Sequence, residues 1–368
     1  MRAYRYRLYP TKQQGGLMRS HLWLSKELWN ELLAHTKAMY RDYGHFATKS
    51  SLREMVKRCG LYSQVAQALV DRLLDAIDRY FRLKALGMKA GFPRFKSFSR
   101  MKSLQYPQSG FSLEGKKLEV SPFGSISIKL HRAIEGRIKT LTLKLQAGKW
   151  FAIFVTSPSS EPKPFIPNNG AKVGLDLGLK SFAVLSDGTN IANPRHLKKH
   201  ERKLIRNQQR LSKKHRWSRN WHKAKQMLAV NNEKVANARR DFHNKLSNKL
   251  IHEYSLIAVE DLHLKELIMK PDQHLNKPIH DAGWSSFVAT LCSKAESAGC
   301  RVVKVEPRGT TQECSRCGRI VQKTLRDRWH HCSCGLSIDR DLNASINILK
   351  RATVGHTGSQ ACGVVLNG

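Results

Sequence analysis

The sequence predicts a multidomain α+β protein, because the periodicity of its apolar residues changes twice along the chain. In residues 11–87, apolar residues recur every three or four positions, as on helices that bury one face. In residues 104–155, apolar and polar residues alternate, as in short strands with one buried face. From residue 171, short apolar runs alternate with long helical patterns, which is typical of a mixed α/β domain.

The helical segment is expected to form a small domain. Thr11–Gln14 resembles a capping box that starts one helix, and Ser51–Glu54 resembles a second capping box. A third helix is expected to run to about Gly87. The apolar stripes of the first and third helices are Leu24, Leu28 and Leu32, and Val65, Leu69, Leu73, Ile77 and Phe81. Stripes of this kind predict helix packing and not a cofactor site.

The alternating segment predicts a small β-barrel or a curled sheet made of several short strands. Tyr4–Tyr9 has the pattern of another strand, stopped by Pro10, that could join this sheet. Ser157–Asn169 is rich in proline and is interpreted as a linker to the α/β part.

The chain is strongly basic. Its 368 residues include 65 Lys and Arg against 28 Asp and Glu, a formal net charge of +37. So large an excess repels itself in the folded protein, and it favours a polyanionic partner whose counterions are released on binding. Met1–Tyr9 lacks the apolar core of a signal peptide or a membrane anchor. We therefore expect a cytoplasmic protein with no membrane partner, whose eight cysteines are thiols or metal ligands.

Arg195–Lys249 concentrates this charge, with 18 Lys and Arg against three acidic residues. Apolar residues recur every seven and every four positions there, which predicts two long helices that pack by one side. A solvated face is the plain interpretation of a charge run, but the asymmetry favours contact with phosphates. Trp217 and Trp221 lie between basic residues and fit either stacking on bases or ordinary packing.

Asp176 is the first candidate for a metal ligand. The apolar residues of the strand pattern Val173–Leu177 share one face, so Asp176 points to the other. A carboxylate within a buried strand is unfavourable without a partner, and a metal ion is the obvious one. The small neighbours Gly174 and Gly178 would let an ion or a phosphate approach the backbone.

Two further acidic positions stand at the ends of predicted elements. Glu260 follows the apolar strand Leu256–Val259, where it either marks a site at the sheet edge or faces solvent. Asp339 and Asp341 precede the apolar stripe of a helix, either as acids that the helix dipole favours or as ligands. Asn343 could add an amide oxygen or a supporting hydrogen bond.

The strand aspartate, the strand-end glutamate and the helix-start aspartate together suit Mg²⁺ or Mn²⁺, which prefer hard oxygen ligands. Two such ions ~3.5–4 Å apart would activate water and stabilise the leaving oxygen in phosphodiester hydrolysis. Asp176, Glu260 and Asp341 are therefore the candidate catalytic and magnesium-binding residues.

Four cysteines form a zinc-binding pattern. Cys314 and Cys317 are separated by 14 residues from Cys332 and Cys334, and a glycine follows each pair. Four thiolates make a closed tetrahedral Zn²⁺ site, which indicates a structural zinc ribbon and not a catalytic metal. A redox-active pair is the alternative, but it leaves the second pair unexplained. The remaining cysteines are expected to be free or buried: Cys59, Cys292, Cys300 and Cys362.

The order of these motifs resembles the TnpB family, whose members are transposon-encoded relatives of the compact type V CRISPR effectors. The resemblance rests on Gly174-Leu175-Asp176-Leu177-Gly178, Val259-Glu260-Asp261-Leu262, the cysteine quartet and Asp339-Arg340-Asp341-Leu342-Asn343-Ala344. Further matching blocks are Gly91-Phe92-Pro93-Arg94-Phe95-Lys96, Asp281-Ala282-Gly283-Trp284 and Thr311-Gln312-Glu313-Cys314. The resemblance covers nearly the whole chain.

The resemblance implies an RNA-guided DNA endonuclease, with a guide RNA from the transposon end and a double-stranded DNA target, acting at the nucleoid of a prokaryotic cell. The family's catalytic residues fall on Asp176, Glu260 and Asp341, and Gln67 matches a position that reads a short motif beside the target. The implied domains are a wedge β-barrel domain (1–10 and 96–168), a helical recognition domain (11–95), a ribonuclease H-like (RuvC-like) nuclease domain (169–309 and 337–352), an inserted zinc ribbon (310–336) and a C-terminal tail (353–368).

Three other functions fit parts of the pattern. A guide-free nuclease or resolvase could use the same fold and would cut DNA without RNA. An actin–hexokinase type ATPase also has an Asp-Leu-Gly strand, but Leu179-Lys180-Ser181 does not resemble its phosphate loop. A zinc-ribbon DNA-binding regulator would need none of the acids.

Overall fold

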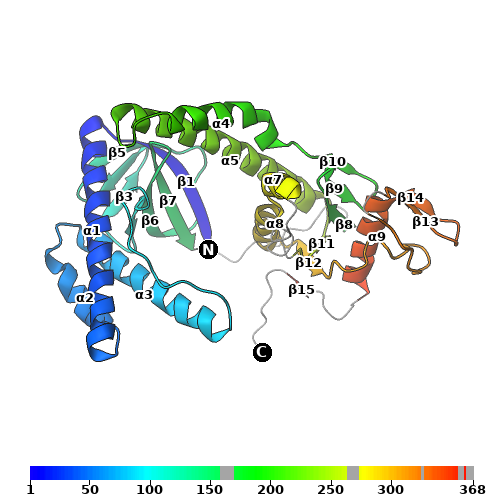
Figure 1. Cartoon of the computed structure of the whole chain (residues 1–368), viewed down its shortest axis with the longest axis horizontal. Helices are drawn as coiled ribbons and strands as arrows, with labels where there is room; N and C mark the ends of the chain where they lie inside the picture. Colours follow the sequence, from blue (N-terminus) through cyan, green and yellow to red (C-terminus); the bar gives the residue numbers. More distant parts are fainter. Residues whose placement is uncertain (158–169, 263–272, 325–326, 355–359, 362–368) are drawn as a thin grey trace. The chain divides into compact units, whose positions relative to one another are not determined.

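The structure is a computed structural model that describes residues 1–157, 170–262, 273–324, 327–354 and 360–361 (Figure 1). The chain divides into two compact units, Met1–Glu161 and Pro162–Gly368, and each contains helices and a sheet. The expectation of a multidomain α+β protein is confirmed. The linker predicted at 157–169 lies, apart from Ser157, outside the described residues. Within the described part, none of the helices has the length and apolarity that a membrane span requires.

The first unit contains a seven-stranded antiparallel sheet with the order β2-β6-β7-β1-β5-β4-β3. Its strands are β1 (Arg2–Tyr9), β2 (Ser103–Tyr106), β3 (Phe111–Glu114), β4 (Lys117–Val120), β5 (Gly124–Lys129), β6 (Arg137–Gln146) and β7 (Lys149–Ser157). β1 lies between β7 and β5, so the N-terminal strand joins the sheet as expected. β2 and β3 end the order, so hydrogen bonding among the described strands makes an open sheet and not a closed barrel.

The helices of this unit are α1 (Lys12–Tyr43), α2 (Lys49–Met55), the short 3₁₀ helix η1 (Val56–Arg58) and α3 (Ser63–Ala85). The capping box at Thr11–Gln14 is present and starts α1. The box predicted at Ser51–Glu54 is wrong. Thr48 caps α2 instead, because its side chain accepts a hydrogen bond from the backbone N–H of Ser51 at 3.2 Å.

One hydrophobic core joins the helices and the sheet of the first unit. It includes Tyr6 and Phe154 from the sheet and Leu32 and Leu69 from α1 and α3, all at most 2% exposed. The alternation of apolar residues along the strands and the stripes along the helices therefore face the same core.

The second unit contains a six-stranded sheet with the order β10-β9-β8-β11-β12-β15. Its strands are β8 (Lys172–Leu177), β9 (Ser181–Leu185), β10 (Asn190–Ala192), β11 (Leu256–Glu260), β12 (Arg301–Val305) and β15 (Gln360–Ala361). β8, β11 and β12 are parallel to one another, whereas β9 and β10 return as antiparallel hairpins. The described residues of the C-terminal tail include β15, which pairs with β12 in an antiparallel direction.

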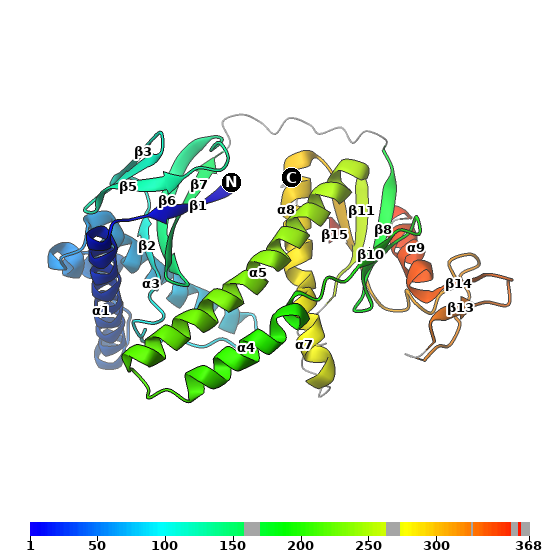
Figure 2. The same ribbon diagram turned by 90° about the horizontal axis from the view of Figure 1, so that it is seen from above.

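Helices cover both faces of this sheet (Figure 2). α5 (Arg219–Glu253) and α8 (Trp284–Ala298) pack on the face that carries Val173, Leu175 and Ile257. α9 (Arg340–Thr353) packs on the opposite face, where Ile348 contacts Ala258 and Val303. α4 (His196–Ser212) runs beside α5, so the two long basic helices are confirmed. The remaining elements are α7 (Gln273–Ala282), β13 (Trp329–His331) and β14 (Ser337–Asp339).

Candidate functional site

The sheet register brings two of the candidate acids side by side. β8 and β11 pair in parallel with Leu175 opposite Val259, so the next residues along the two strands are Asp176 and Glu260. Because side chains alternate along a strand, both acids point to the face that α9 covers. They therefore meet at the carboxyl ends of two neighbouring parallel strands.

α9 adds the third acid. Asp339 is its N-cap and accepts hydrogen bonds from the backbone N–H groups of Asp341 and Leu342, at 2.8 and 3.2 Å. Asp341 lies in the first turn, and the guanidinium of Arg340 contacts its Oδ1 at 3.1 Å. As expected, one aspartate caps the helix and the other lies beside it.

Gly174 lets α9 approach β8. A Cβ on Gly174 would lie 2.0 Å from the carbonyl oxygen of Ser345 and 2.8 Å from the backbone nitrogen of Leu349. The helix backbone therefore rests directly on the strand. The interpretation that Gly174 opens space for a metal or a phosphate is wrong, because the helix that carries Asp341 fills this space.

The carboxylates repel one another. Burial, followed by the charges of Glu260 and Asp341, raises the pKa of Asp176 well above its usual range. Asp339 adds to this effect, and Arg340 offsets part of it. The three predicted acids are therefore brought together, although they do not close into a compact ligand group as the cysteines do among the described residues.

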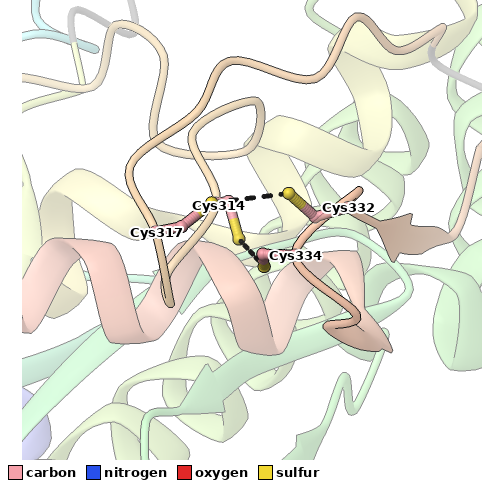
Figure 3. Close-up of side chains that lie close together, drawn as sticks. All are labelled: Cys314, Cys317, Cys332 and Cys334. Atoms are coloured by element: carbon pink, nitrogen blue, oxygen red, sulfur yellow. Dashed lines mark hydrogen bonds between the residues drawn. The ribbon is translucent and has the colours of Figure 1, made fainter.

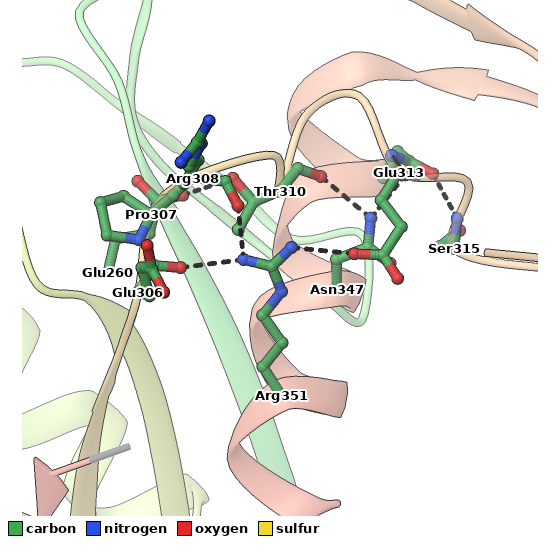
Figure 4. Close-up of polar contacts among 10 residues, drawn as sticks. Glu260, Glu306, Pro307, Arg308, Thr310, Glu313, Ser315, Asn347 and Arg351 are labelled. Atoms are coloured by element: carbon green, nitrogen blue, oxygen red, sulfur yellow. Dashed lines mark hydrogen bonds and ion pairs between the residues drawn. The ribbon is translucent and has the colours of Figure 1, made fainter. Parts of the chain in front are cut away.

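A buried hydroxyl fixes the side chain of Glu260 (Figure 4). Thr310, only 2% exposed, donates from Oγ1 to Glu260 Oε1 at 2.6 Å, with the Pro307 carbonyl as a second acceptor at 3.1 Å. Burial raises the pKa of Glu260, whereas the Thr310 hydrogen bond and the charge of Arg351 act in the opposite direction. Thr310 was not among the predicted residues, because its role depends on a contact 50 residues away in sequence.

α9 also holds the segment that carries Thr310 (Figure 4). Asn347 donates from Nδ2 to the carbonyl of Thr310 at 2.9 Å. Arg351 donates to the carbonyls of Glu306 and Arg308 and to the carboxylate of Glu313, at 3.0, 2.8 and 2.8 Å. One helix thus carries Asp341 and, through Thr310, supports Glu260.

Asn343 serves the same segment. Its side chain is fully buried, accepts from the backbone N–H of Ser315 at 2.9 Å and donates to the carbonyl of Glu313 at 2.7 Å. The amide expected to assist the acids instead anchors the chain where it enters the cysteine-rich segment. The spacing of Asn343, Asn347 and Arg351, four residues apart on one helix face, was the available sequence signal.

The four cysteines converge (Figure 3). The Sγ atoms of Cys314 and Cys334 are 3.6 Å apart, those of Cys317 and Cys332 are 3.5 Å apart, and all four lie within 4.8 Å of one another. Ligands ~2.3 Å from a tetrahedral zinc ion are separated by about 3.8 Å, so the quartet fits that ion. The backbone N–H of Cys334 contributes most to lowering the pKa of Cys332 to about 6.

Comparisons with known proteins agree with this architecture. A family model described as "Probable transposase" matches residues 154–269, one described as "Cas12f1-like, TNB domain" matches 284–348, and one described as "Helix-turn-helix domain" matches 1–45. The last range contains a strand and a single long helix here. The structure is similar to that of a Cas12f1–sgRNA–target DNA complex, with a TM-score of 0.59 and 16% identity, over 92% of this chain and 82% of that one.

Two curated relatives are similar to this chain in sequence. "Putative RNA-guided DNA endonuclease InsQ" of Escherichia coli is 29% identical over 99% of this chain and 94% of its own length. "TnpB-like protein L79" of Acanthamoeba polyphaga mimivirus is 28% identical over 58% of this chain and 43% of its own length. The chain is thus similar both to proteins named RNA-guided DNA endonuclease and to proteins named TnpB-like. The fold expected of a TnpB protein, a multidomain α+β chain, is the one observed.

The two predicted nucleic-acid contacts lie on separate units. Gln67 is on α3 in the first unit, with its side chain partly exposed. In the second unit, Trp217 and Trp221 lie near the start of α5, with ring centroids 5.3 Å apart. Trp217 is 63% exposed, and Arg216 and Lys225 lie over the two rings. Ordinary core packing, one of the two interpretations, therefore does not describe Trp217.

Proposed function

We propose that this chain is a transposon-associated, RNA-guided DNA endonuclease that hydrolyses phosphodiester bonds of its target beside a short adjacent motif. The observation that carries the proposal is the meeting of Asp176, Glu260 and Asp341 on one face of the sheet. The net charge of +37 supports a nucleic-acid partner, and relatives that bear the name RNA-guided DNA endonuclease support the reaction.

The acids fit a divalent cation. Asp176 is buried beside two other carboxylates, and Arg340 alone among the groups acting on it stabilises its charge. Oxygen ligands around an excess of negative charge are what Mg²⁺ and Mn²⁺ require. Asp176, Glu260 and Asp341 would hold the ions, which when bound supply an activated water and neutralise the leaving oxygen.

The surrounding residues orient these ligands. Thr310 directs one oxygen of Glu260 and leaves the other free of that contact. Asp339 fixes the first turn of α9 and so the backbone position of Asp341. Arg340 pairs with Asp341 and limits the repulsion between the acids. The three carboxylates are thus placed by a strand, a strand end and a helix start before any ion binds.

The other parts have proposed roles that follow from the family. The first unit would supply the recognition (11–95) and wedge (1–10 and 96–168) domains, with Gln67 reading the adjacent motif. The second unit would supply the RuvC-like nuclease domain (169–309 and 337–352), the zinc ribbon (310–336) and the tail (353–368). Cys314, Cys317, Cys332 and Cys334 would hold the structural zinc.

The decisive test compares Asp176→Ala with Asp241→Ala, a change at an exposed acid on α5. Protein purified with the RNA from its native locus should cleave a matching DNA in Mg²⁺. Asp176→Ala should abolish cleavage and retain DNA binding, whereas Asp241→Ala should retain both. Unchanged cleavage by Asp176→Ala would remove the catalytic assignment.

Sequencing the co-purified RNA tests the guide. A discrete RNA whose segment specifies the cleaved DNA is expected. Cleavage by protein that carries no discrete RNA would favour a guide-free nuclease.

A further inference from the structure

Lys96 is held against α1 in the first unit, and its ammonium lies beside a buried aromatic ring of that helix. The amide of Asn30 accepts from Lys96 N at 2.7 Å and donates to Lys96 O at 3.0 Å. Trp29 Nε1 donates to the neighbouring Arg94 carbonyl at 3.2 Å. Lys96 Nζ lies 3.0 Å from the centroid of the buried Trp29 ring. Three hydrogen bonds thus hold the backbone of this segment against α1, and the Trp29 ring lies next to the Lys96 ammonium.

The charge of a second cation acts on Lys96, and the described residues show no acidic partner for either group. Arg72 on α3 acts electrostatically on Lys96, and no carboxylate opposes it. Asp71, beside Arg72 in sequence, pairs with Lys49 at 2.7 Å. Residues 79–113 contain eight Lys and Arg and no Asp or Glu. The segment that carries Lys96 therefore offers no counter-charge of its own.

This arrangement is unfavourable for the free protein. Burial, followed by the charge of Arg72, lowers the pKa of Lys96 to about 8, and burial lowers the pKa of Arg72. With this pKa, Lys96 remains mostly charged near pH 7, and an arginine guanidinium keeps its proton in proteins. Partly buried cations side by side lower stability unless an anion joins them. The face of the Trp29 ring compensates for this cost only in part.

We propose that Lys96 and Arg72 form a binding site for a backbone phosphate of a nucleic acid. The ammonium supplies a point charge, and the guanidinium supplies a planar set of N–H donors for phosphate oxygens. RNA and DNA share this phosphodiester chemistry. Such a contact positions the nucleic acid and carries no sequence information. The site goes beyond the proposed cleavage, because it requires binding without any reaction.

The test uses the full chain with Lys96→Met, which keeps the length and packing of the side chain and removes its charge. Lys12→Met is the matched control, because Lys12 is exposed at the start of α1. Binding of a short DNA duplex and of a short single-stranded RNA is measured by fluorescence anisotropy over a range of NaCl concentrations. The Tm of each free variant is measured in parallel.

Lys96→Met should weaken binding about 3- to 10-fold and lower the slope of log K against log salt by about one, while leaving Tm equal or higher. Weaker binding of the DNA probe alone, of the RNA probe alone or of both identifies which nucleic-acid backbone the site contacts. Unchanged slopes with both probes, or an equal loss for Lys12→Met, would overturn the site. A lower Tm would mean that Lys96 stabilises the fold of the free protein, and this result would also overturn the site. If Lys96→Met does not fold, Arg72→Met decides by the same criteria.

Discussion

At the scale of single residues, the negative charge of Asp176 is unfavourable in the folded protein when no metal is bound, because the side chain is buried near other carboxylates. Its raised pKa means that its charged form is less favourable in the folded than in the unfolded state. The protonated carboxyl avoids this cost, so its contribution to the stability of the folded state is fully present below the pKa of the unfolded state. That contribution is lost as pH rises through the pKa of the folded state. At neutral pH the free protein is therefore destabilised by this group.

Asp176→Asn should consequently raise the Tm of the protein in EDTA, by about 2–4 °C for each ~1 kcal/mol of relieved repulsion. Mg²⁺ should raise the Tm of the original protein, and Asp176→Asn should abolish this rise. Differential scanning fluorimetry at pH 7 with and without Mg²⁺ measures both effects.

Asp187 provides a control of opposite sign. Burial alone would raise the pKa of Asp187, but hydrogen bonds from Tyr254 and Thr189 lower it. Asp187→Asn should therefore lower Tm and leave the Mg²⁺ response intact. A fall in Tm for Asp176→Asn, as for Asp187→Asn, would contradict the repulsion argument.

Thr310→Val should weaken divalent-ion binding by about 10-fold, because it removes the hydroxyl that orients Glu260 and nearly keeps the side-chain shape. Thr310→Ser should restore binding, since it keeps the hydroxyl. Calorimetric titration of Mn²⁺ into each free variant measures this directly, and Tm in EDTA reports any damage to folding. Equal Mn²⁺ affinity for the valine and serine variants would exclude a positioning role for Thr310.

The sequence could predict the roles of some site residues and not of others. Asp176, Glu260 and Asp341 stand at ends of strongly periodic elements, so their positions followed from pattern and their proximity from a parallel sheet. Thr310 lies in an irregular segment without periodicity, and only its tertiary contact marks it. Cap positions are similarly ambiguous, because Thr48 and Ser51 are both good cap residues three positions apart.

At the scale of elements, the contact between α9 and β8 decides whether the acids meet. The charge of Asp341 acts on Asp176 because the helix backbone touches the strand at Gly174. The sequence pattern placed Gly174 on the correct face of the strand. It could not show that a helix and not a ligand fills the space, since both need the same missing side chain.

Gly174→Ala should therefore lower the free energy of unfolding by about 3 kcal/mol, because its Cβ would collide with backbone that cannot rotate away. Divalent-ion binding should fall with it, as α9 and Asp341 move from the strand. Urea denaturation and Mn²⁺ calorimetry give the two measurements.

Gly16→Ala is the matched control for this substitution. Gly16 lies within α1, and its added Cβ would meet nothing within 4 Å. Alanine should stabilise that helix by about 0.5–1 kcal/mol and leave ion binding unchanged. A Gly174→Ala variant as stable as Gly16→Ala would show that α9 does not rest on β8 as described.

At the scale of the whole molecule, both units share the basic excess. Residues 1–161 carry 29 Lys and Arg against 11 Asp and Glu, and residues 162–368 carry 36 against 17. The charge is thus a property of the entire chain and not of one helix pair. Composition alone predicted this property, because it depends on no contact.

The sign of the salt effect on stability should consequently depend on whether nucleic acid is bound. In the free protein, raising salt from 0.01 to 0.1 M shortens the screening length from about 30 to about 10 Å and weakens the self-repulsion, so Tm should rise. In the complex with a short DNA duplex, the same salt displaces the polyanion that stabilises the fold, so Tm should fall. Thermal scans at matched protein concentration measure both trends. Salt weakens self-repulsion and so raises Tm, but it also weakens the binding of DNA and so lowers Tm. If Tm changes in the same direction with and without DNA, the excess charge is neutralised within the protein itself.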